Sequence, residues 1–141
     1  IADQIEKPGN LGAMLRSAKA FGFNTVLVCD GKTNVFNPNV IRASIGHLFS
    51  MNVITSSSSE VITYLDNNEI EIILLDPTSE KSIKSYRTNK RFALVVGSEH
   101  EGLSKKWFDE KNTRLKIDSS VDIDSINAST AASIAMWELG K

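Results

Sequence analysis

Two polar side chains, Asn10 and Arg16, stand six positions apart in a segment whose other residues predict a helix. A guanidinium stays protonated and can clamp phosphate, whereas an amide both donates and accepts hydrogen bonds. The segment is entered through Pro8-Gly9-Asn10, and its apolar residues recur at helical spacing: Leu11, Met14, Leu15, Ala18 and Phe21. A capped helix is the simplest interpretation, and a helix end that carries a polar site is the alternative.

A second candidate is the sequence GSEHEGLS, which begins at Gly97. Its glycines have the spacing of a phosphate-binding loop, but Leu103 stands where that loop requires lysine. Glu99 and Glu101 would also repel a triphosphate, so we exclude nucleotide hydrolysis. Gly97 and Gly102 indicate a tight turn or a close approach of the backbone to another group. The loop is therefore either a plain strand-to-helix turn or a site for a cationic ligand, which suits its acidic residues.

A third candidate opens the last predicted helix. Asp124 or Ser125 is placed to cap this helix, and Ser125 and Asn127 fall in its first turn. Free backbone N–H groups point outward there and can hold a polar ligand. Small residues follow on one face, which permits close packing against another helix: Ala128, Ala131, Ala132 and Ala135. An ordinary buried helix is the alternative interpretation.

Other kinds of site find little support in the residues present. His47 and His100 are the only histidines, and no cysteine or further histidine beside them completes a metal site. Neither a G-x-S-x-G nucleophile elbow nor a G-x-G-x-x-G dinucleotide motif occurs. Cys29 is the single cysteine and lies in the apolar run TVLVC. We therefore expect it to be a reduced core residue rather than a nucleophile.

Apolar runs predict the strands that position these candidates. Three runs are continuously apolar, as in strands covered on both faces: 25–30, 71–76 and 92–97. Two weaker runs lie at 51–55 and 113–118. Helical patterns alternate with them at 10–22, 38–46, 58–68, 104–111 and 125–139. The alternation predicts one α/β domain over residues 1–141, with a mostly parallel sheet flanked by helices. Ligands bind such sheets beyond the carboxyl ends of the strands, where Asp30, Asp76-Pro77 and Gly97 to Glu99 stand.

Composition limits the partners and the location of the protein. The formal net charge is −1, so no global basic field attracts nucleic acid, and the basic segment 81–91 is best interpreted as a solvated surface loop. No apolar run approaches the roughly 18 residues of a membrane span, and no signal peptide is visible. The single cysteine fits a reducing cytosol. The chain starts beside a motif and stops inside a predicted helix, as a fragment of a longer protein would.

Together and in order, the three candidates resemble the motifs of the SpoU (TrmH) family of SPOUT RNA ribose methyltransferases. The first motif, an asparagine and an arginine on a helix entered through Pro-Gly-Asn, reads PGNLGAMLR, with Asn10 and Arg16. The second, an apolar strand ending in Gly-x-Glu and followed by Gly, reads LVVGSEHEG, with Gly97, Glu99 and Gly102. The third, a strand ending Ile-Pro-Met and then Ser-Leu-Asn before an alanine-rich helix, reads LKIDSSVDIDSINASTAA. The match covers nearly the whole chain.

The third motif departs from the family pattern. Asp118 and Ser119 replace Pro-Met, Val121 stands where glycine is common, and Ile126 replaces leucine. A catalytically weak RNA-binding module that retains the SPOUT fold is therefore an alternative to an active enzyme. An unrelated α/β small-molecule enzyme is a third interpretation, which requires the three motif matches to be coincidental.

The resemblance implies an α/β fold with a C-terminal trefoil knot, in which backbone groups of three loops bind S-adenosyl-L-methionine. In this sequence the implied cofactor-binding residues are Leu75, Asp76, Pro77, Val96, Gly97, Ser98, Gly102, Ile117, Ser125, Ile126, Asn127 and Ala128. The resemblance also implies methylation of a ribose 2′-hydroxyl in tRNA or rRNA, a cytoplasmic homodimer, and neither a metal nor a membrane.

In the family the central catalytic residue is the arginine of the first motif, here Arg16, and the resemblance gives Asn10, Glu99, Ser125 and Asn127 the task of positioning it and the acceptor. Because arginine stays protonated, we expect a clamp on phosphate and ribose that stabilises a developing alkoxide, rather than a base. The implied dimer packs the first and last helices against a partner, and the alanine face at 128–135 suits that interface. The RNA-binding domain that many relatives carry is expected outside this chain.

Overall fold

The apolar runs form two three-stranded sheets in the computed structural model, which describes residues 1–120 and 126–140. One sheet has the order β1-β2-β3, with β1 (Ala2–Asp3), β2 (Thr25–Cys29) and β3 (Asn52–Ser56). The other has the order β5-β4-β6, with β4 (Glu71–Leu75), β5 (Phe92–Val95) and β6 (Thr113–Leu115). Every pairing between these strands is parallel, and a bridge between Ala2 and Val96 joins the two sheets.

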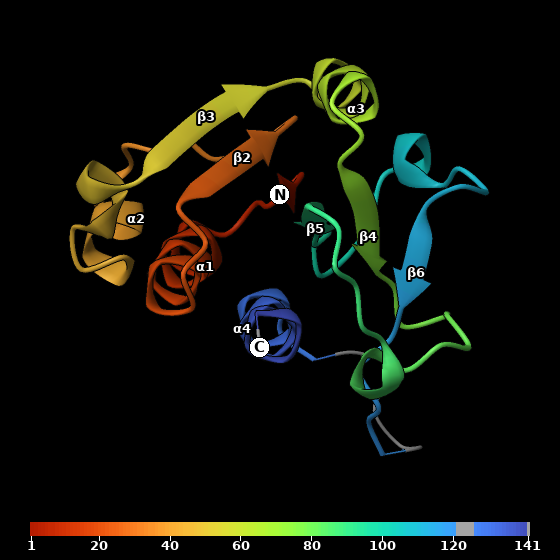
Figure 1. Cartoon of the computed structure of the whole chain (residues 1–141). Coiled ribbons are helices and arrows are strands. Elements are labelled where there is room, and N and C mark those ends of the chain that lie inside the picture. The colour runs from red at the N-terminus through yellow and green to blue at the C-terminus, as the bar shows by residue number, and fades with distance from the viewer. Residues whose placement is uncertain (121–125, 141) are drawn as a thin grey trace.

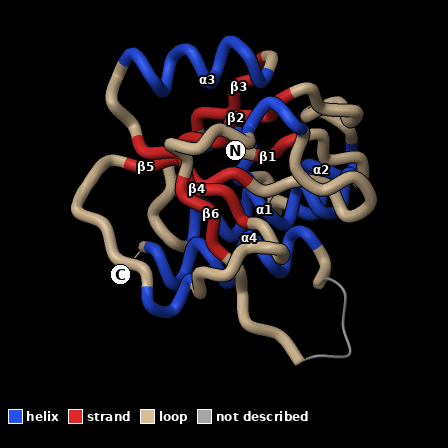
Figure 2. The backbone as a smooth tube through the Cα atoms, turned by 90° about the vertical axis from the view of Figure 1, so that its right-hand side faces the viewer, coloured by secondary structure: helices blue, strands red, loops and turns tan. Residues whose placement is uncertain are grey.

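Helices cover both faces of the strands. Figure 2 shows α3 (Ser58–Asn67) on one side and α1 (Pro8–Ala20) and α4 (Ala128–Leu139) on the other, while α2 (Pro38–Ala43) lies beside α1 (Figure 1). Three short 3-10 turns complete the described elements: η1 (His47–Ser50), η2 (Ile83–Ser85) and η3 (Lys105–Trp107). The predicted α/β architecture, with parallel strands flanked by helices, is thus confirmed for the described residues.

Two clusters of buried apolar side chains hold these layers together. The larger cluster lies against α1 and α4, and the smaller joins Val61 and Leu65 of α3 to Trp107 and Cys29. Cys29 is fully buried in the smaller cluster, as expected for a core residue, and this burial raises the pKa of its thiol to about 12. The basic side chains between Lys81 and Arg91 are exposed, as expected for a surface segment.

Two helical predictions are wrong in detail. The helix expected at 104–111 is only the turn η3, because Phe108 leaves helical geometry with φ −83° and ψ 85°. The last helix begins at Ala128, because Asn127 is itself the cap and accepts hydrogen bonds from the N–H groups of Ser129 (3.0 Å) and Thr130 (3.2 Å). The cap is therefore neither Asp124 nor Ser125, which both lie outside the described residues.

The alanine face of α4 packs inside the chain. Ala128, Ala132 and Ala135 are buried in the larger cluster, and α4 lies directly against α1. The expectation that this face suits a dimer interface is therefore wrong, because an alanine stripe permits equally close packing within one chain. The exposed side of α4 carries Ile134 and Trp137 instead, with Trp137 against the ring of Phe21 (centroids 5.8 Å apart).

Candidate active site

Three polar side chains from distant parts of the sequence meet at one point. The Nδ2 of Asn10, at the start of α1, donates to Glu99 Oε1 (3.1 Å) in the loop after β5. The Nδ2 of Asn127, the cap of α4, donates both to Asn10 Oδ1 (3.0 Å) and to Glu99. An ion pair with Lys7 and the hydrogen bond from Asn10 lower the pKa of Glu99, so this carboxylate is ionised at neutral pH. The structure thus brings residues of the three sequence motifs together.

A cavity of about 350 Å³ opens beside this polar cluster. Its walls come from the ends of β4 and β5, the loop after β5, the segment after β6, and the start of α4. The proposed cofactor residues that line it are Leu75, Asp76, Pro77, Val96, Gly97, Ser98, Gly102, Ile117, Ile126 and Ala128. Asn127 lies in the polar cluster next to it, and Ser125 lies outside the described residues. The residues singled out by the resemblance therefore share one concave site at the carboxyl edge of the second sheet.

The loop from Gly97 to Gly102 is a tight hairpin. Ser98 and Gly102 exchange two backbone hydrogen bonds of 3.1 Å each, and Gly102 has a left-handed φ of 68°. A Cβ on Gly97 would lie 2.3 Å from both the carbonyl carbon and the carbonyl oxygen of Gly102. The first glycine is therefore required by close backbone approach, and the second by its conformation.

Asp76 is held by β6 rather than left free in the cavity. Its Oδ2 accepts from Arg114 Nε (2.8 Å), and its Oδ1 accepts from the backbone N–H (2.9 Å) and hydroxyl (2.8 Å) of Thr78. Burial acts to raise the pKa of Asp76, but these hydrogen bonds and the Arg114 charge outweigh it and lower the pKa. The Arg114 guanidinium also lies 5.3 Å from the ring centroid of Phe108, another cavity residue. Arg114 thus fixes the wall of the cavity that follows β4.

Replacing Arg114 with alanine should destabilise this wall. The change leaves a buried carboxylate oxygen without its donor, which costs about 1–3 kcal/mol of unfolding free energy. Urea denaturation at neutral pH gives the value. Arg87→Ala is the matched control, because Arg87 is exposed and its ion pair with Glu138 (3.4 Å) is worth about 0–1 kcal/mol. Equal losses in the two variants would contradict a specific role for Arg114.

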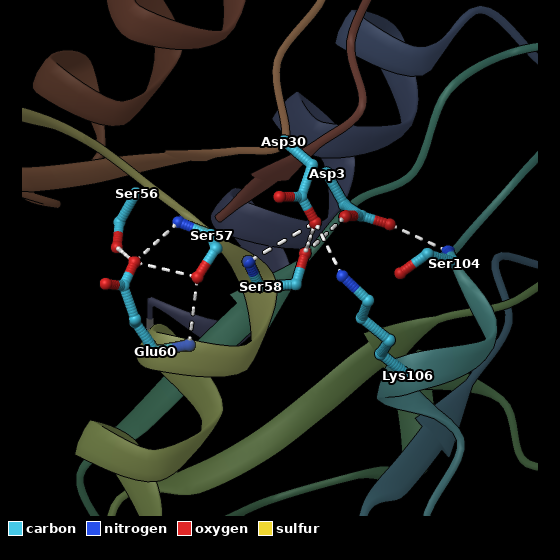
Figure 3. A network of polar contacts seen from close by, with 8 residues as sticks. All are labelled: Asp3, Asp30, Ser56, Ser57, Ser58, Glu60, Ser104 and Lys106. Carbon is cyan, nitrogen blue, oxygen red and sulfur yellow. Dashed lines mark hydrogen bonds and ion pairs between the residues drawn. The ribbon is translucent and has the colours of Figure 1, made fainter.

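A buried carboxylate that the sequence did not single out anchors the far end of the same loop (Figure 3). Asp3 is fully buried, and its Oδ2 accepts from the backbone N–H of Ser104 (2.7 Å). The Ser58 hydroxyl bridges Asp3 Oδ1 (3.2 Å) and Asp30 Oδ2 (2.6 Å), and Lys106 approaches Asp30 at 3.3 Å. The Ser58 hydrogen bond is the main cause that lowers the pKa of Asp30. Asp3 ends β1 and Asp30 directly follows its parallel neighbour β2, but β1 is too short to show in the sequence, so no sequence signal indicated this network.

Arg16 lies apart from the polar cluster within one chain. Six residues of helix separate it from Asn10, which corresponds to about 240° of rotation and about 9 Å of rise. Gly12, one turn before Arg16 and on the same face, packs against α2, since a Cβ there would lie 2.5 Å from Ala43 Cβ. Arg16 is exposed, and its side chain makes no hydrogen bond or ion pair with the residues that the structure describes. Helix α1 therefore presents Asn10 to the cavity and Arg16 toward the side of α2.

Over residues 1–120 and 126–140, no group of three or more histidine, cysteine or acidic side chains is arranged to hold a metal ion. In the same ranges, no helix has the length and apolar character needed to cross a bilayer.

Residues 1–137 match the SpoU rRNA Methylase family. The chain is 28% identical over 142 residues to the 23S rRNA (guanosine(2553)-2'-O)-methyltransferase of Bacillus subtilis, in a match that covers 99% of this chain and 56% of that relative. A crystal structure of an RNA 2'-O ribose methyltransferase is 36% identical, with a TM-score of 0.88 over 97% of this chain and 53% of the other. The SpoU methyltransferase AviRb from Streptomyces viridochromogenes, in complex with the cofactor AdoMet, is 26% identical, with a TM-score of 0.91 over 97% and 54%.

The chain thus spans about half the length of these three proteins. Because the family match extends over nearly all of its residues, the chain belongs to the SpoU rRNA methylase family.

Proposed function

We propose that this chain is the catalytic domain of an enzyme that transfers a methyl group from S-adenosyl-L-methionine to a ribose 2′-hydroxyl in tRNA or rRNA. One observation carries the proposal: a cavity of about 350 Å³ adjoins the cluster of Asn10, Glu99 and Asn127, where all three family motifs meet. The relatives named above as 2′-O-methyltransferases support the same reaction for the longer protein.

The cavity has the size and the chemistry for the proposed cofactor. Small-molecule sites enclose about 300–1,000 Å³ and are mostly apolar with a few polar groups, and here Leu75, Val96 and Ile117 supply apolar walls. Glu99 and Glu101 lie at the same cavity and complement a cationic ligand. When bound, S-adenosylmethionine would supply an electrophilic methyl group on a positively charged sulfur. The tight hairpin at Gly97 would present backbone N–H and C=O groups to the adenosine.

The polar cluster has the chemistry to hold the acceptor ribose. Asn10 and Asn127 provide amide groups, and Glu99, whose pKa is lowered, provides an ionised carboxylate. As the new C–O bond forms and the C–S bond breaks, the 2′-hydroxyl must release its proton to solvent or to a neighbouring base. Positioning by the cluster, with Ser125 as the remaining proposed member, would favour the in-line geometry that this displacement requires.

We also propose a homodimer in which Arg16 of one subunit completes the site of the other. Arg16 points away from the cavity of its own chain and is exposed, so a second copy docked on the α1 and α4 side is the simplest way to bring it to a ribose. There it would clamp phosphate and stabilise the developing alkoxide. Light scattering at working concentration tests this directly, and a monomer would contradict it.

The alternative, a weak RNA-binding module, depends on the altered third motif. Asp118 is exposed, accepts a hydrogen bond from Ser82 (2.7 Å) and lies 3.6 Å from Lys84, whereas Ile117 and Ser119 line the cavity. The acidic replacement is thus paired outside the cavity, which favours the enzyme over the module. A C-terminal trefoil knot, a cytoplasmic location and an RNA-binding domain elsewhere in the longer protein complete the proposal.

Calorimetry and RNA mapping test the proposal in sequence. S-adenosylmethionine should bind the chain saturably below millimolar concentration, and absence of binding at millimolar concentration would favour the module. The full-length protein should then add a 2′-O-methyl group to a defined nucleotide when total RNA is mapped with and without it. Cofactor binding without any change in ribose methylation would reject the proposed acceptor.

A further inference from the structure

A dense group of positive charges lies on the segment that connects β4 to β5. Residues 81–91 contain five lysine and arginine side chains and no acidic one, although the net charge of the whole chain is −1. All five are exposed, and we call them the basic strip: Lys81, Lys84, Arg87, Lys90 and Arg91. Because like charges repel one another, such a strip is best compensated by an anionic partner.

The start of the basic strip is fixed beside the cavity of the proposed active site. The backbone N–H of Lys116 donates to the Lys81 carbonyl (2.8 Å), and the Ser82 hydroxyl donates to Asp118 Oδ2 (2.7 Å). The residues on both sides of Asp118 line the cavity. Lys81 and Lys84 therefore stand next to the cavity wall that follows β6.

The end of the basic strip reaches the opposite edge of the second sheet. The Thr88 hydroxyl donates to Glu71 Oε2 (2.8 Å), and the Arg91 carbonyl accepts from the Glu71 N–H (2.9 Å). Glu71 begins β4, whereas the cavity adjoins the other end of this strand, at Leu75. In Figure 1, η2, which contains Lys84, accordingly lies at the lower end of β4, away from α3. The strip thus follows the length of β4, which is about 15 Å.

The charges of the basic strip are only weakly compensated within the chain. Lys84 lies 3.6 Å from Asp118, and Arg87 lies 3.4 Å from Glu138. The two basic side chains are 74% and 66% exposed. Exposed ion pairs of this kind contribute little and are readily exchanged for another anion. The strip can therefore take up phosphate groups without breaking the fold.

The lysines near the loop after β5 are compensated more closely. Lys7 pairs with Glu99, and Lys32 pairs with Glu6 (2.5 Å) and Glu101 (3.3 Å). Glu99 and Glu101 also line the cavity. A polyanion is therefore attracted to the cavity from the side of the basic strip rather than from the side of this acidic loop.

We propose that the basic strip binds the phosphates of an RNA strand that leads into the proposed active site. The inference rests on the proposed function and adds to it the surface that holds the substrate. Neighbouring phosphates of one nucleic-acid strand are a few ångströms apart, so the strip spans several of them. Phosphate contacts position a nucleic acid without reading its bases, so the strip orients the RNA and leaves the choice of nucleotide to other contacts.

Lysine footprinting of the full-length protein tests where the RNA lies. A mixed-sequence RNA oligonucleotide should protect Lys81, Lys84 and Lys90 from acetylation, as mass spectrometry measures residue by residue. Lys105 and Lys111 are the internal references, because η3 packs against α3 and Lys111 pairs with Asp66 of α3 (2.7 Å). Equal protection of strip and reference lysines would overturn the proposal. Protection of the strip by phosphatidylserine vesicles but not by RNA would also overturn it, in favour of a membrane surface.

Two matched double variants measure how much the strip contributes to binding. Lys81→Gln with Lys84→Gln removes two charges from the strip, and Lys105→Gln with Lys111→Gln removes two charges elsewhere. The strip variant should bind the RNA oligonucleotide at least about tenfold more weakly at about 100 mM salt, and its slope of log affinity against log salt should fall by about 1.4. The reference variant should keep both values. Equal losses in the two variants would indicate general attraction of RNA and contradict the strip.

Two further measurements separate the strip from the active site. The affinity of the strip variant for S-adenosylmethionine should be unchanged, because Ser82 still holds Asp118 outside the cavity. A loss of cofactor affinity with unchanged RNA affinity would show a structural role and overturn the proposal. If the strip lysines are protected but no ribose is methylated, the proposed function fails and the strip stands. If methylation occurs and the strip variant binds RNA normally, the strip alone fails.

Discussion

Arg16→Ala should abolish ribose methylation in the full-length protein while leaving the fold and the cofactor affinity of each subunit unchanged. Loss of one donor that stabilises developing negative charge costs about 10²–10³ in rate, and we expect at least that loss. Stability should not change, because the Arg16 side chain is exposed and makes no hydrogen bond or ion pair with described residues. Initial rates with labelled cofactor and thermal melts provide the two measurements.

Two control variants separate charge from geometry at this position. Arg16→Lys keeps the positive charge but loses the planar fork that grips phosphate, so it should retain only a small part of the activity. Lys19→Ala removes another cation of α1, whose Nζ donates to the Ser50 carbonyl (3.1 Å). The methylation rate of this variant should stay close to that of the unaltered protein. Similar losses in Arg16→Ala and Lys19→Ala would instead indicate general attraction of RNA by a basic helix.

Subunit mixing distinguishes an Arg16 that acts within its chain from one that acts across a dimer. If Arg16 completes the partner's site, subunits with Arg16→Ala and subunits with Asn127→Ala are both inactive alone. Each heterodimer then contains one intact site. It should therefore have about half of the activity of an unaltered dimer, which contains two. No recovery after mixing, with exchange of subunits verified, would contradict the shared site.

The parts of the fold that the sequence predicted well are those with a strong local signal. The runs at 25–30, 71–76 and 92–97 became β2, β4 and β5 within one or two residues, because strands buried on both faces must be continuously apolar. The helix patterns near 10–22 and 58–68 correspond to α1 and α3 for a similar reason. By contrast, β1 has two residues, too few for any periodic pattern to show.

The sequence motifs predicted which side chains would gather at the candidate site, but not the residues that hold those side chains in place. Asn10, Glu99 and Asn127 belong to sequence motifs, and they do meet in space. The contact between Asp3 and Ser104 joins residues 101 positions apart, and only the paired strands bring them together. The direction of Arg16 was equally hidden, because it depends on how α2 packs on Gly12 rather than on the spacing from Asn10.

Gly97→Ala should be the most damaging single-methyl change in the chain. The added Cβ would lie 2.3 Å from the carbonyl group of Gly102 and 2.5 Å from the Leu103 nitrogen. All of these atoms are backbone, so no side-chain rotation relieves the overlap, and the hairpin bonds between Ser98 and Gly102 must break. We expect a loss of at least about 100-fold in affinity for S-adenosylmethionine, together with about 1–3 kcal/mol of unfolding free energy, typical of overpacking.

Two other glycines turn this prediction into a graded test. A Cβ on Gly9, at the start of α1, would meet no other atom within 4 Å, so Gly9→Ala should leave stability and cofactor affinity almost unchanged. Gly102 also has open space but a left-handed φ of 68°, so Gly102→Ala should cost only the conformational penalty of about 1–2 kcal/mol. Calorimetry should therefore rank the affinities as Gly9→Ala, then Gly102→Ala, then Gly97→Ala. If Gly97→Ala binds the cofactor as well as Gly9→Ala does, the hairpin is not a wall of the cofactor site, because a displaced backbone at that wall must change the affinity.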